Sequence, residues 1–170
     1  MISDGVAEDS SSILPPPSIA IIIAIYNGAE TLAACLESLV EQHVLPDQII
    51  IQDGGSIDDT LKIVEAFRPH LSHVTSVRDA GIYDAWNKAL QHVQSDWVWF
   101  LGCDDCLADK NVIARLKEDL SSAPADVGLV YGIAHNVSPN GLVSERVGKP
   151  WGRAKEAIAY RMSVPHTALL

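Results

Sequence analysis

The chain has 170 residues, 48% of them hydrophobic and 20% charged, which is typical of one globular domain rather than a disordered or fibrous protein. Its 22 acidic and 12 basic residues give a net charge of −10, so we expect no nucleic-acid binding, which needs a basic surface. No apolar run reaches the roughly 20 residues of a membrane-spanning helix, and the N-terminus lacks the features of a secretory signal. We therefore expect a cytoplasmic protein and leave open peripheral association with the inner face of the membrane.

The first 18 residues have no hydrophobic period. They are polar and then proline-rich, with three consecutive prolines at positions 15–17 that cannot lie inside a strand or helix. We expect residues 1–18 to be a mobile leader and residues 19–170 to form one domain.

From residue 19 onward, strand-like and helix-like segments alternate. The run IAIIIAI (19–25) is continuously apolar, as in a strand buried on both faces of a parallel sheet. Apolar residues at helical spacing predict a helix over 29–43, and QIIIQD (48–53) reads as a second strand. Asp58 is a suitable N-cap for the next helix. Further along, we expect a strand at 72–78, a helix at 82–93, a strand at 96–102, a helix at 112–120, and strands at 127–135 and 141–147 paired across a turn.

This alternation predicts an α/β fold with a mainly parallel sheet flanked by helices. The chain ends in SVPHTALL, which reads as another apolar strand. We expect either that the sequence is truncated at its C-terminus or that a partner segment completes the fold. An unfinished sheet edge would also favour pairing, for example as a homodimer.

Polar and aromatic residues follow the predicted strands. Ligands of open parallel sheets bind beyond the carboxyl ends of the strands, so these residues are the candidate site. They are Tyr26 and Asn27 after the first strand, Asp53, Gly54 and Gly55 at the second, Arg78, Asp79 and Gly81 after the third, and Asp104 and Asp105 after the fourth.

Their chemistry suits a nucleotide diphosphate. Tyr26 can stack on a planar base, and the Asp53 carboxylate can accept a hydrogen bond from the N–H of a uracil or guanine ring. Asp104 and Asp105 suit Mg²⁺ or Mn²⁺, which take one or two carboxylates plus substrate phosphates. Each residue also has a simpler explanation: Tyr26 in a turn, Asp53 bonded to turn amides, and the aspartate pair in a solvated connection. Their convergence at one edge favours the site.

Cys103-x-x-Cys106 surrounds the aspartate pair and has the spacing of a redox dithiol or half a zinc site. The two intervening carboxylates would raise a thiol pKa rather than depress it, and no second close pair completes a zinc site. We expect both cysteines to be packing residues, so a thioredoxin-like protein ranks last among the alternatives.

Four segments in register carry a resemblance to a known family. These are IAIIIAIYNGAETLAACLESLVEQ, IIIQDGGSIDDTLKIV, RDAGIYDAWNKAL and DWVWFLGCDD, within residues 18–135. Together they resemble the family 2 glycosyltransferases of the GT-A fold, a Rossmann-like nucleotide-diphospho-sugar transferase fold, and above all the bacterial members that build cell-surface polysaccharides.

The resemblance implies roles for individual positions. Asp105 matches the direct ligand of Mg²⁺ or Mn²⁺, Asp84 bonds within its own block, and His166 matches a residue on the acceptor side. Tyr26 matches the residue against the base and Asp53 the residue that holds it. The donor-binding positions implied are Ile25, Tyr26, Asn27, Asp53, Gly54, Asp79, Gly81, Lys88 and Asp104.

The implied reaction moves a sugar from a nucleotide-diphosphate sugar, which we expect to be a UDP-sugar, to a hydroxyl of a glycan or lipid-linked acceptor, with inversion. The family's catalytic base lies further along than Leu170, so no residue is named for it. One alternative is a truncated module that binds a nucleotide sugar without turnover. Another is a nucleotidyltransferase, although YNGAET (26–31) lacks the basic residues of its phosphate loop.

Overall fold

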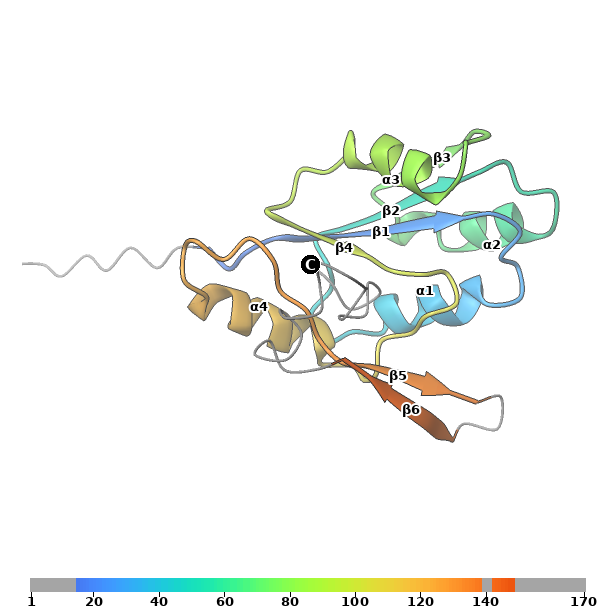
Figure 1. Cartoon of the computed structure of the whole chain (residues 1–170). Helices are drawn as coiled ribbons and strands as arrows, with labels where there is room; N and C mark the ends of the chain where they lie inside the picture. The colour runs from blue at the N-terminus through green and yellow to red at the C-terminus, as the bar shows by residue number, and fades with distance from the viewer. Residues whose placement is uncertain (1–14, 139–141, 149–170) are drawn as a thin grey trace, which may run out of the picture.

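The computed structural model describes residues 15–138 and 142–148, and its centre is a parallel sheet with the strand order β3-β2-β1-β4 (Figure 1). A two-stranded antiparallel hairpin, β5–β6, follows later in the chain. The predicted alternation of strands and helices is therefore confirmed. In chain order the elements are β1 (Ile19–Ile25), α1 (Leu32–Val40), β2 (Gln48–Asp53), α2 (Thr60–Ala66), η1 (Arg68–His70), β3 (His73–Ser76), α3 (Ile82–Leu90), β4 (Trp97–Phe100), α4 (Val112–Ser122), β5 (Ala134–Val137) and β6 (Val143–Val147).

Strand β1 lies inside the sheet because it is apolar on both faces. It pairs in parallel with β2, where Ile22 lies opposite Ile50, and with β4, where Ile22 lies opposite Phe100. Alternate side chains of a strand point to opposite faces. Accordingly, Ile21 and Ile23 belong to the larger apolar core, whereas Ile22 belongs to a smaller cluster on the other face.

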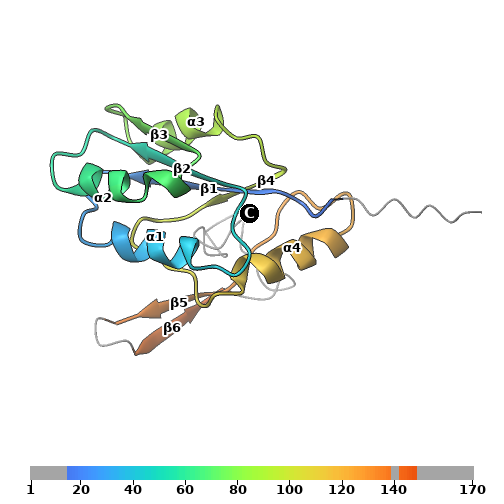
Figure 2. The same ribbon diagram turned by 180° about the vertical axis from the view of Figure 1, so that it is seen from behind.

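Helices cover both faces of the sheet (Figures 1 and 2). On one face, Leu36 of α1, Val64 of α2 and Ile113 of α4 share the larger core. On the other face, Ala89 of α3 packs with Ile22 and Ile50. This two-sided burial accounts for the continuous apolar run of β1, because neither face of the strand meets water.

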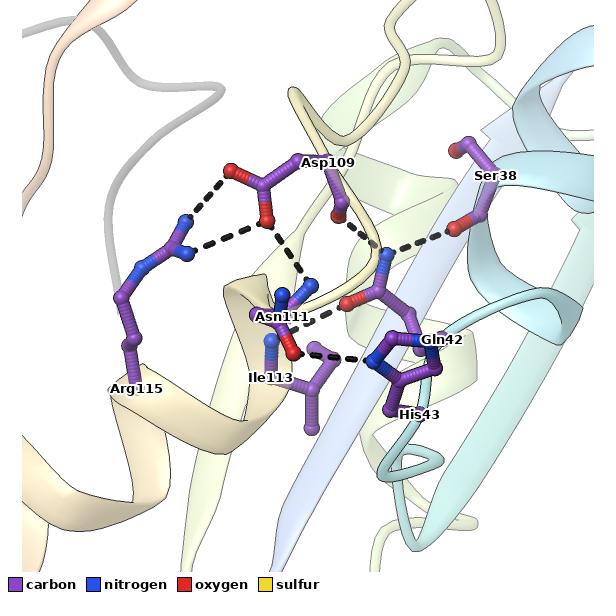
Figure 3. A network of polar contacts seen from close by, with 7 residues as sticks. All are labelled: Ser38, Gln42, His43, Asp109, Asn111, Ile113 and Arg115. Carbon is purple, nitrogen blue, oxygen red and sulfur yellow. Dashed lines mark hydrogen bonds and ion pairs between the residues drawn. The ribbon is translucent and has the colours of Figure 1, made fainter.

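A polar network joins the end of α1 to the start of α4 (Figure 3). The amide nitrogen of the buried Gln42 donates to the carbonyl oxygens of Ser38 at 3.0 Å and Asp109 at 2.6 Å. Its amide oxygen accepts the backbone N–H of Ile113 at 3.2 Å. The Asp109 carboxylate in turn accepts two hydrogen bonds from the Arg115 guanidinium, at 3.1 and 2.9 Å. The network therefore fixes the start of α4 against α1.

Several predicted elements are shorter in the structure. The helix predicted over 29–43 is α1, and the strands predicted at 72–78 and 96–102 are β3 and β4. The prediction of a strand at 127–135 is wrong in position, because β5 begins only at Ala134. Ala134 pairs with Val147 of β6. Exposed glycines at 128 and 132 interrupt the apolar run, and glycine weakens a strand interior.

Two residues beside element starts differ from expectation, Asp58 before α2 and Ser18 before β1. Helix α2 begins at Thr60, and the Asp58 carboxylate accepts the Thr60 backbone N–H at 3.0 Å without being the N-cap residue itself. The sequence predicts that Ser18 belongs to the leader, but this residue is part of the fold. Its N–H and hydroxyl donate to the Asp96 carboxylate at 2.9 and 2.6 Å.

Residues 1–14 of the predicted leader and the segment containing His166 lie outside the described residues. Within the described ranges, no helix is both long enough and apolar enough to cross a membrane.

Candidate functional site

The carboxyl ends of the parallel strands meet at one edge of the sheet, as the sequence predicted. The backbone ladder continues past the strands, because the Gly54 N–H donates to the Ile25 carbonyl at 2.8 Å. The Leu101 N–H donates to the Ile22 carbonyl at 3.0 Å, and the Val77 N–H to the Asp53 carbonyl at 2.9 Å. The loops that carry the candidate residues therefore leave the sheet side by side.

Asn27 joins the loop after β1 to the loop after β2. Its backbone has a φ of 53°, in the left-handed region that asparagine tolerates better than most residues. Its N–H donates to the Ser56 hydroxyl at 2.8 Å, and its side-chain oxygen accepts the Ile57 N–H at 2.9 Å. This bracing leaves the neighbouring Tyr26 63% exposed at the edge.

The Asp53 carboxylate is fully buried and is satisfied by its own loop. It accepts the Gly55 N–H at 3.1 Å and the Ser56 N–H at 3.1 Å, together with the Ser56 hydroxyl. The Ser76 hydroxyl of β3 donates to it at 2.5 Å. An ionised carboxylate has about four acceptor positions, so these donors occupy it fully. Asp53 therefore stabilises the turn through its amides, which is the simpler of the two explanations offered by the sequence.

Asp79 lies against Gly54 at the same edge. A Cβ atom added at Gly54 would stand only 2.6 Å from Oδ2 of Asp79, so the absence of a side chain there makes room for this carboxylate. Oδ1 of Asp79 accepts the Gly81 N–H at 2.9 Å. Gly81 has a φ of 119°, which favours glycine, and it is the residue before α3.

Asp84 bonds within its own segment, as expected from the sequence. Its carboxylate accepts the Ala80 N–H at 3.0 Å and pairs with the Lys88 ammonium at 2.8 Å. The hydrogen bond from Lys88 is the main cause that lowers the pKa of Asp84. Lys88 also donates to the Arg78 carbonyl at 3.2 Å, so it ties the loop before α3 to the helix.

Asp104 and Asp105 turn back over Gly102, just after β4. A Cβ atom at Gly102 would stand 2.6 Å from Oδ2 of Asp105 and 2.8 Å from Oδ1 of Asp104, so the two carboxylates converge on one point. Two carboxylate oxygens suit Mg²⁺ or Mn²⁺, which complete their coordination with water and substrate phosphates. Among the described residues, no group of three or more histidine, cysteine, aspartate or glutamate side chains could hold a metal alone. The aspartate pair therefore fits a metal that arrives with a phosphate ligand.

The cysteines have the character of packing residues rather than nucleophiles. Cys35 is buried, and Cys103 packs against the larger core. Burial first, and then the charge of a neighbouring aspartate, raise the pKa of both Cys103 and Cys106. A catalytic dithiol needs a depressed pKa, so these thiols disfavour thioredoxin-like chemistry.

Three polar residues at this edge were not identified from the sequence. Ser56 and Ser76 hold Asp53, and Gln52 is buried one position before it. Pairing of β2 with β3 places Ser76 opposite Asp53, which sequence periodicity does not reveal. The sequence does carry a signal for Gln52, because this polar residue interrupts a run that otherwise reads as a buried strand.

The sequence model of one protein family, described as glycosyl transferase family 2, matches residues 20–167. The "PGL/p-HBAD biosynthesis glycosyltransferase" of Mycobacterium bovis is 31% identical over 159 residues, which cover 90% of this chain and 58% of that protein. The chain therefore spans somewhat more than half the length of this curated relative.

Solved structures show the same likeness. S. aureus TarS in complex with UDP-GlcNAc is 26% identical with a TM-score of 0.56, over 61% of this chain and 31% of that one. Glucosyl-3-phosphoglycerate synthase of Mycobacterium tuberculosis, in complex with Mn²⁺, UDP and phosphoglyceric acid, has a TM-score of 0.55 at 22% identity, over 68% of this chain and 42% of that one. This second likeness concerns the fold alone, and both agree with the fold predicted from the sequence.

Proposed function

The chain belongs to glycosyl transferase family 2 and has the GT-A fold, and on that premise we propose that it binds a nucleotide-diphosphate sugar at the carboxyl edge of the sheet for transfer to an acceptor hydroxyl. The observation that carries the proposal is the convergence of Asp104 and Asp105 over Gly102, at the edge where Tyr26 is exposed. A diphosphate bound between them would place its base toward Tyr26 and its phosphates toward the aspartates.

The base lies against Tyr26 and is held by Asp79. Tyr26 offers an exposed aromatic face on a braced loop, which suits stacking. Since the Asp53 carboxylate is occupied by four donor groups, we assign the hydrogen bond from a base N–H to Asp79 instead. Asp53 then supports the pocket by shaping the turn at Gly54. A UDP-sugar is the expected donor, in keeping with UDP-GlcNAc bound to the 26% identical TarS.

The other donor-side residues shape the pocket. Ile25 accepts the Gly54 N–H through its carbonyl, and Asn27 braces the Tyr26 loop. Gly81 lets the chain turn into α3. Lys88 is paired with Asp84 and bonded to the Arg78 carbonyl, so its role is to hold the loop rather than to contact phosphate directly.

Asp105, with Asp104 beside it, would hold Mg²⁺ or Mn²⁺. When bound, the ion neutralises charge on the diphosphate leaving group. A divalent ion is needed here because the chain carries a net charge of −10 and the edge is lined by aspartates, which by themselves repel a diphosphate.

In the reaction, the oxygen of an acceptor hydroxyl attacks the anomeric carbon while the bond from that carbon to the diphosphate breaks. In-line attack inverts the anomeric configuration, and the hydroxyl proton passes to a base. We assign this base to no described residue. The proposed acceptor is a glycan or a lipid-linked glycan of the bacterial surface; the name of the M. bovis relative places that protein in PGL/p-HBAD biosynthesis.

A second candidate is donor binding without turnover by this 170-residue chain. It concerns the 170 residues alone, which match 58% of the length of the M. bovis relative. Incubation with UDP-sugars, followed by chromatography for released UDP, separates the two: binding with release supports a transferase, and binding without release supports the module.

Isothermal titration of UDP into the wild-type chain tests the proposal. With Mn²⁺ we expect saturable binding, and with EDTA we expect it to fall at least tenfold, about 1.4 kcal/mol. GDP and dTDP, titrated in the same way, report on the choice of base. A folded chain that binds none of the three nucleotides would overturn the proposed function.

A further inference from the structure

Strand β2 carries two glutamines on the same face. Gln48 and Gln52 are four positions apart, with Ile50 between them, and alternate residues of a strand share a face. Ile50 packs with Ala89 and Trp86 of α3, so this is the face that α3 covers. The two glutamines therefore share one face at opposite ends of the strand, where Gln48 is half-buried and Gln52 is buried.

Gln48, at the amino end, has hydrogen bonds at both its amide oxygen and its amide nitrogen. Its amide oxygen accepts the Gln94 N–H at 2.7 Å and, from Ser95, the N–H at 3.1 Å and the hydroxyl at 3.0 Å. Its amide nitrogen donates to the His92 carbonyl at 3.2 Å. This side chain has an evident structural role, because it fastens the segment after α3 to the sheet.

Gln52, at the carboxyl end, is only 1% exposed, and its Nε2 has no hydrogen-bond acceptor among the described residues. A buried donor without a partner lowers stability, and an apolar side chain of similar size would avoid that cost. An unsatisfied buried polar group needs an explanation, and such departures are expected at functional sites. The amide therefore calls for an acceptor that is present when the site is in use.

Asp79 supplies a suitable acceptor. Gly54 is two positions beyond Gln52 and still pairs with β1 through its N–H. Position 54 therefore faces the same side of the sheet as Gln52. Two strand residues advance about 6.6 Å, a distance that a glutamine side chain and a hydrogen bond of about 3 Å together span. Oδ2 of Asp79 fills the space left by the missing Gly54 side chain, whereas Oδ1 is bonded to the Gly81 N–H.

We infer that Gln52 is a positioning residue for Asp79: with nucleotide bound, Gln52 Nε2 donates to Oδ2 of Asp79 and fixes this carboxylate to accept the N–H of the base. The inference rests on the proposed function. It accounts for a glutamine in the otherwise apolar interior of β2 and for a glycine at position 54, since a larger residue there would separate the amide from the carboxylate.

The test compares Gln52→Met with Gln48→Met, which changes the same residue type on the same face of the same strand. Thermal unfolding is measured without nucleotide, and UDP affinity by calorimetry with Mn²⁺. For Gln52→Met we expect an unchanged or higher Tm and a five- to tenfold weaker UDP affinity. For Gln48→Met we expect a lower Tm and an unchanged affinity, because its four hydrogen bonds are structural.

A double-mutant cycle shows whether Gln52 acts through Asp79. If it does, Asp79→Asn combined with Gln52→Met binds UDP no more weakly than Asp79→Asn alone. Wild-type affinity in Gln52→Met, a lower Tm in that variant, or losses that multiply in the double variant would each overturn the inference while leaving the proposed function in place. A wild-type chain that does not bind UDP would overturn both.

Discussion

The Gln42 network and the carboxyl edge of the sheet use buried polar side chains in different ways. In the network, one amide makes three hydrogen bonds, to Ser38, Asp109 and Ile113, and both ends of the amide are satisfied (Figure 3). At the carboxyl edge, the amide nitrogen of Gln52, which is also buried, has no acceptor among the described residues. The polar groups of the first region are satisfied within the fold, and we propose that a bound ligand completes the second.

This difference separates residues that stabilise the fold from residues that serve binding. Asp53 sits at the binding edge but belongs to the first group, because four donor groups of the chain occupy its carboxylate. We propose that Tyr26 belongs to the second, because it is exposed on a braced loop. Position at the edge alone therefore does not define function; the hydrogen-bond partners must be counted as well.

The largest expected effect is on stability, at Asp53. Asp53→Ala removes the buried carboxylate that accepts hydrogen bonds from Gly55, Ser56 and Ser76, and a hydrogen bond to a charged group contributes about 1.5–3 kcal/mol. We expect the free energy of unfolding to fall by roughly 4 kcal/mol in urea titrations. Asp59→Ala, at an exposed position, is the control. A loss below about 1 kcal/mol in Asp53→Ala would contradict its role in stabilising the fold.

The Gln42 network predicts a smaller loss without any effect on binding. Gln42→Leu removes three hydrogen bonds and orphans the Ile113 N–H, so we expect a decrease of about 2–3 kcal/mol in the free energy of unfolding. UDP affinity, measured below the unfolding transition, should equal that of the wild type. A weaker UDP affinity in Gln42→Leu would show that the network and the binding edge are coupled, which would contradict their separation into a stabilising and a binding region.

Tyr26 predicts the opposite pattern, a loss of binding without a loss of stability. Tyr26→Ala removes a stacking partner worth about 1–3 kcal/mol, so we expect UDP to bind at least fivefold more weakly at an unchanged Tm. Tyr83→Ala is the matched control, since Tyr83 is 76% exposed. Equal effects of the two substitutions would argue against a specific base contact at Tyr26.

The smallest effect is a pH dependence at the amino end of the sheet. His73 stacks on His92 with ring centroids 3.5 Å apart, and burial, followed by the charges of His92 and Arg68, lowers the pKa of His73. The unfolded chain, with a histidine pKa of about 6.5, then binds more protons than the native chain, so stability falls as the pH drops below that value. Urea titrations at pH 7.5 and 5.5 should show this decrease, and His73→Gln should reduce it. An unchanged pH dependence in that variant would contradict the assignment.

Much of the fold could be predicted from the sequence because local patterns determine it. The apolar run 19–25 and the helical spacing of the following residues are sufficient to place β1 and α1. Element ends were less predictable: the glycines at 128 and 132 displaced β5, and Ser18 joined the fold through Asp96, which is 78 residues away. Such distant partners leave no trace in local periodicity.

The same distinction holds for the site. Residues that follow strands were found because strand ends define them, and their gathering at one edge follows from parallel topology. The occupancy of Asp53 could not be foreseen, since it depends on Ser76 in the neighbouring strand. The room for Asp79 depends in turn on how the loop before α3 lies over Gly54.

The most direct test of the account is Mn²⁺ binding, followed by the electron paramagnetic resonance signal of the free ion as UDP is added. We expect UDP to promote Mn²⁺ binding in the wild type and in the surface control Asp119→Asn. In Asp105→Asn the UDP-dependent affinity should fall at least tenfold, about 1.4 kcal/mol. Wild-type Mn²⁺ binding in Asp105→Asn would contradict the central claim that the aspartates over Gly102 hold the metal at the donor site.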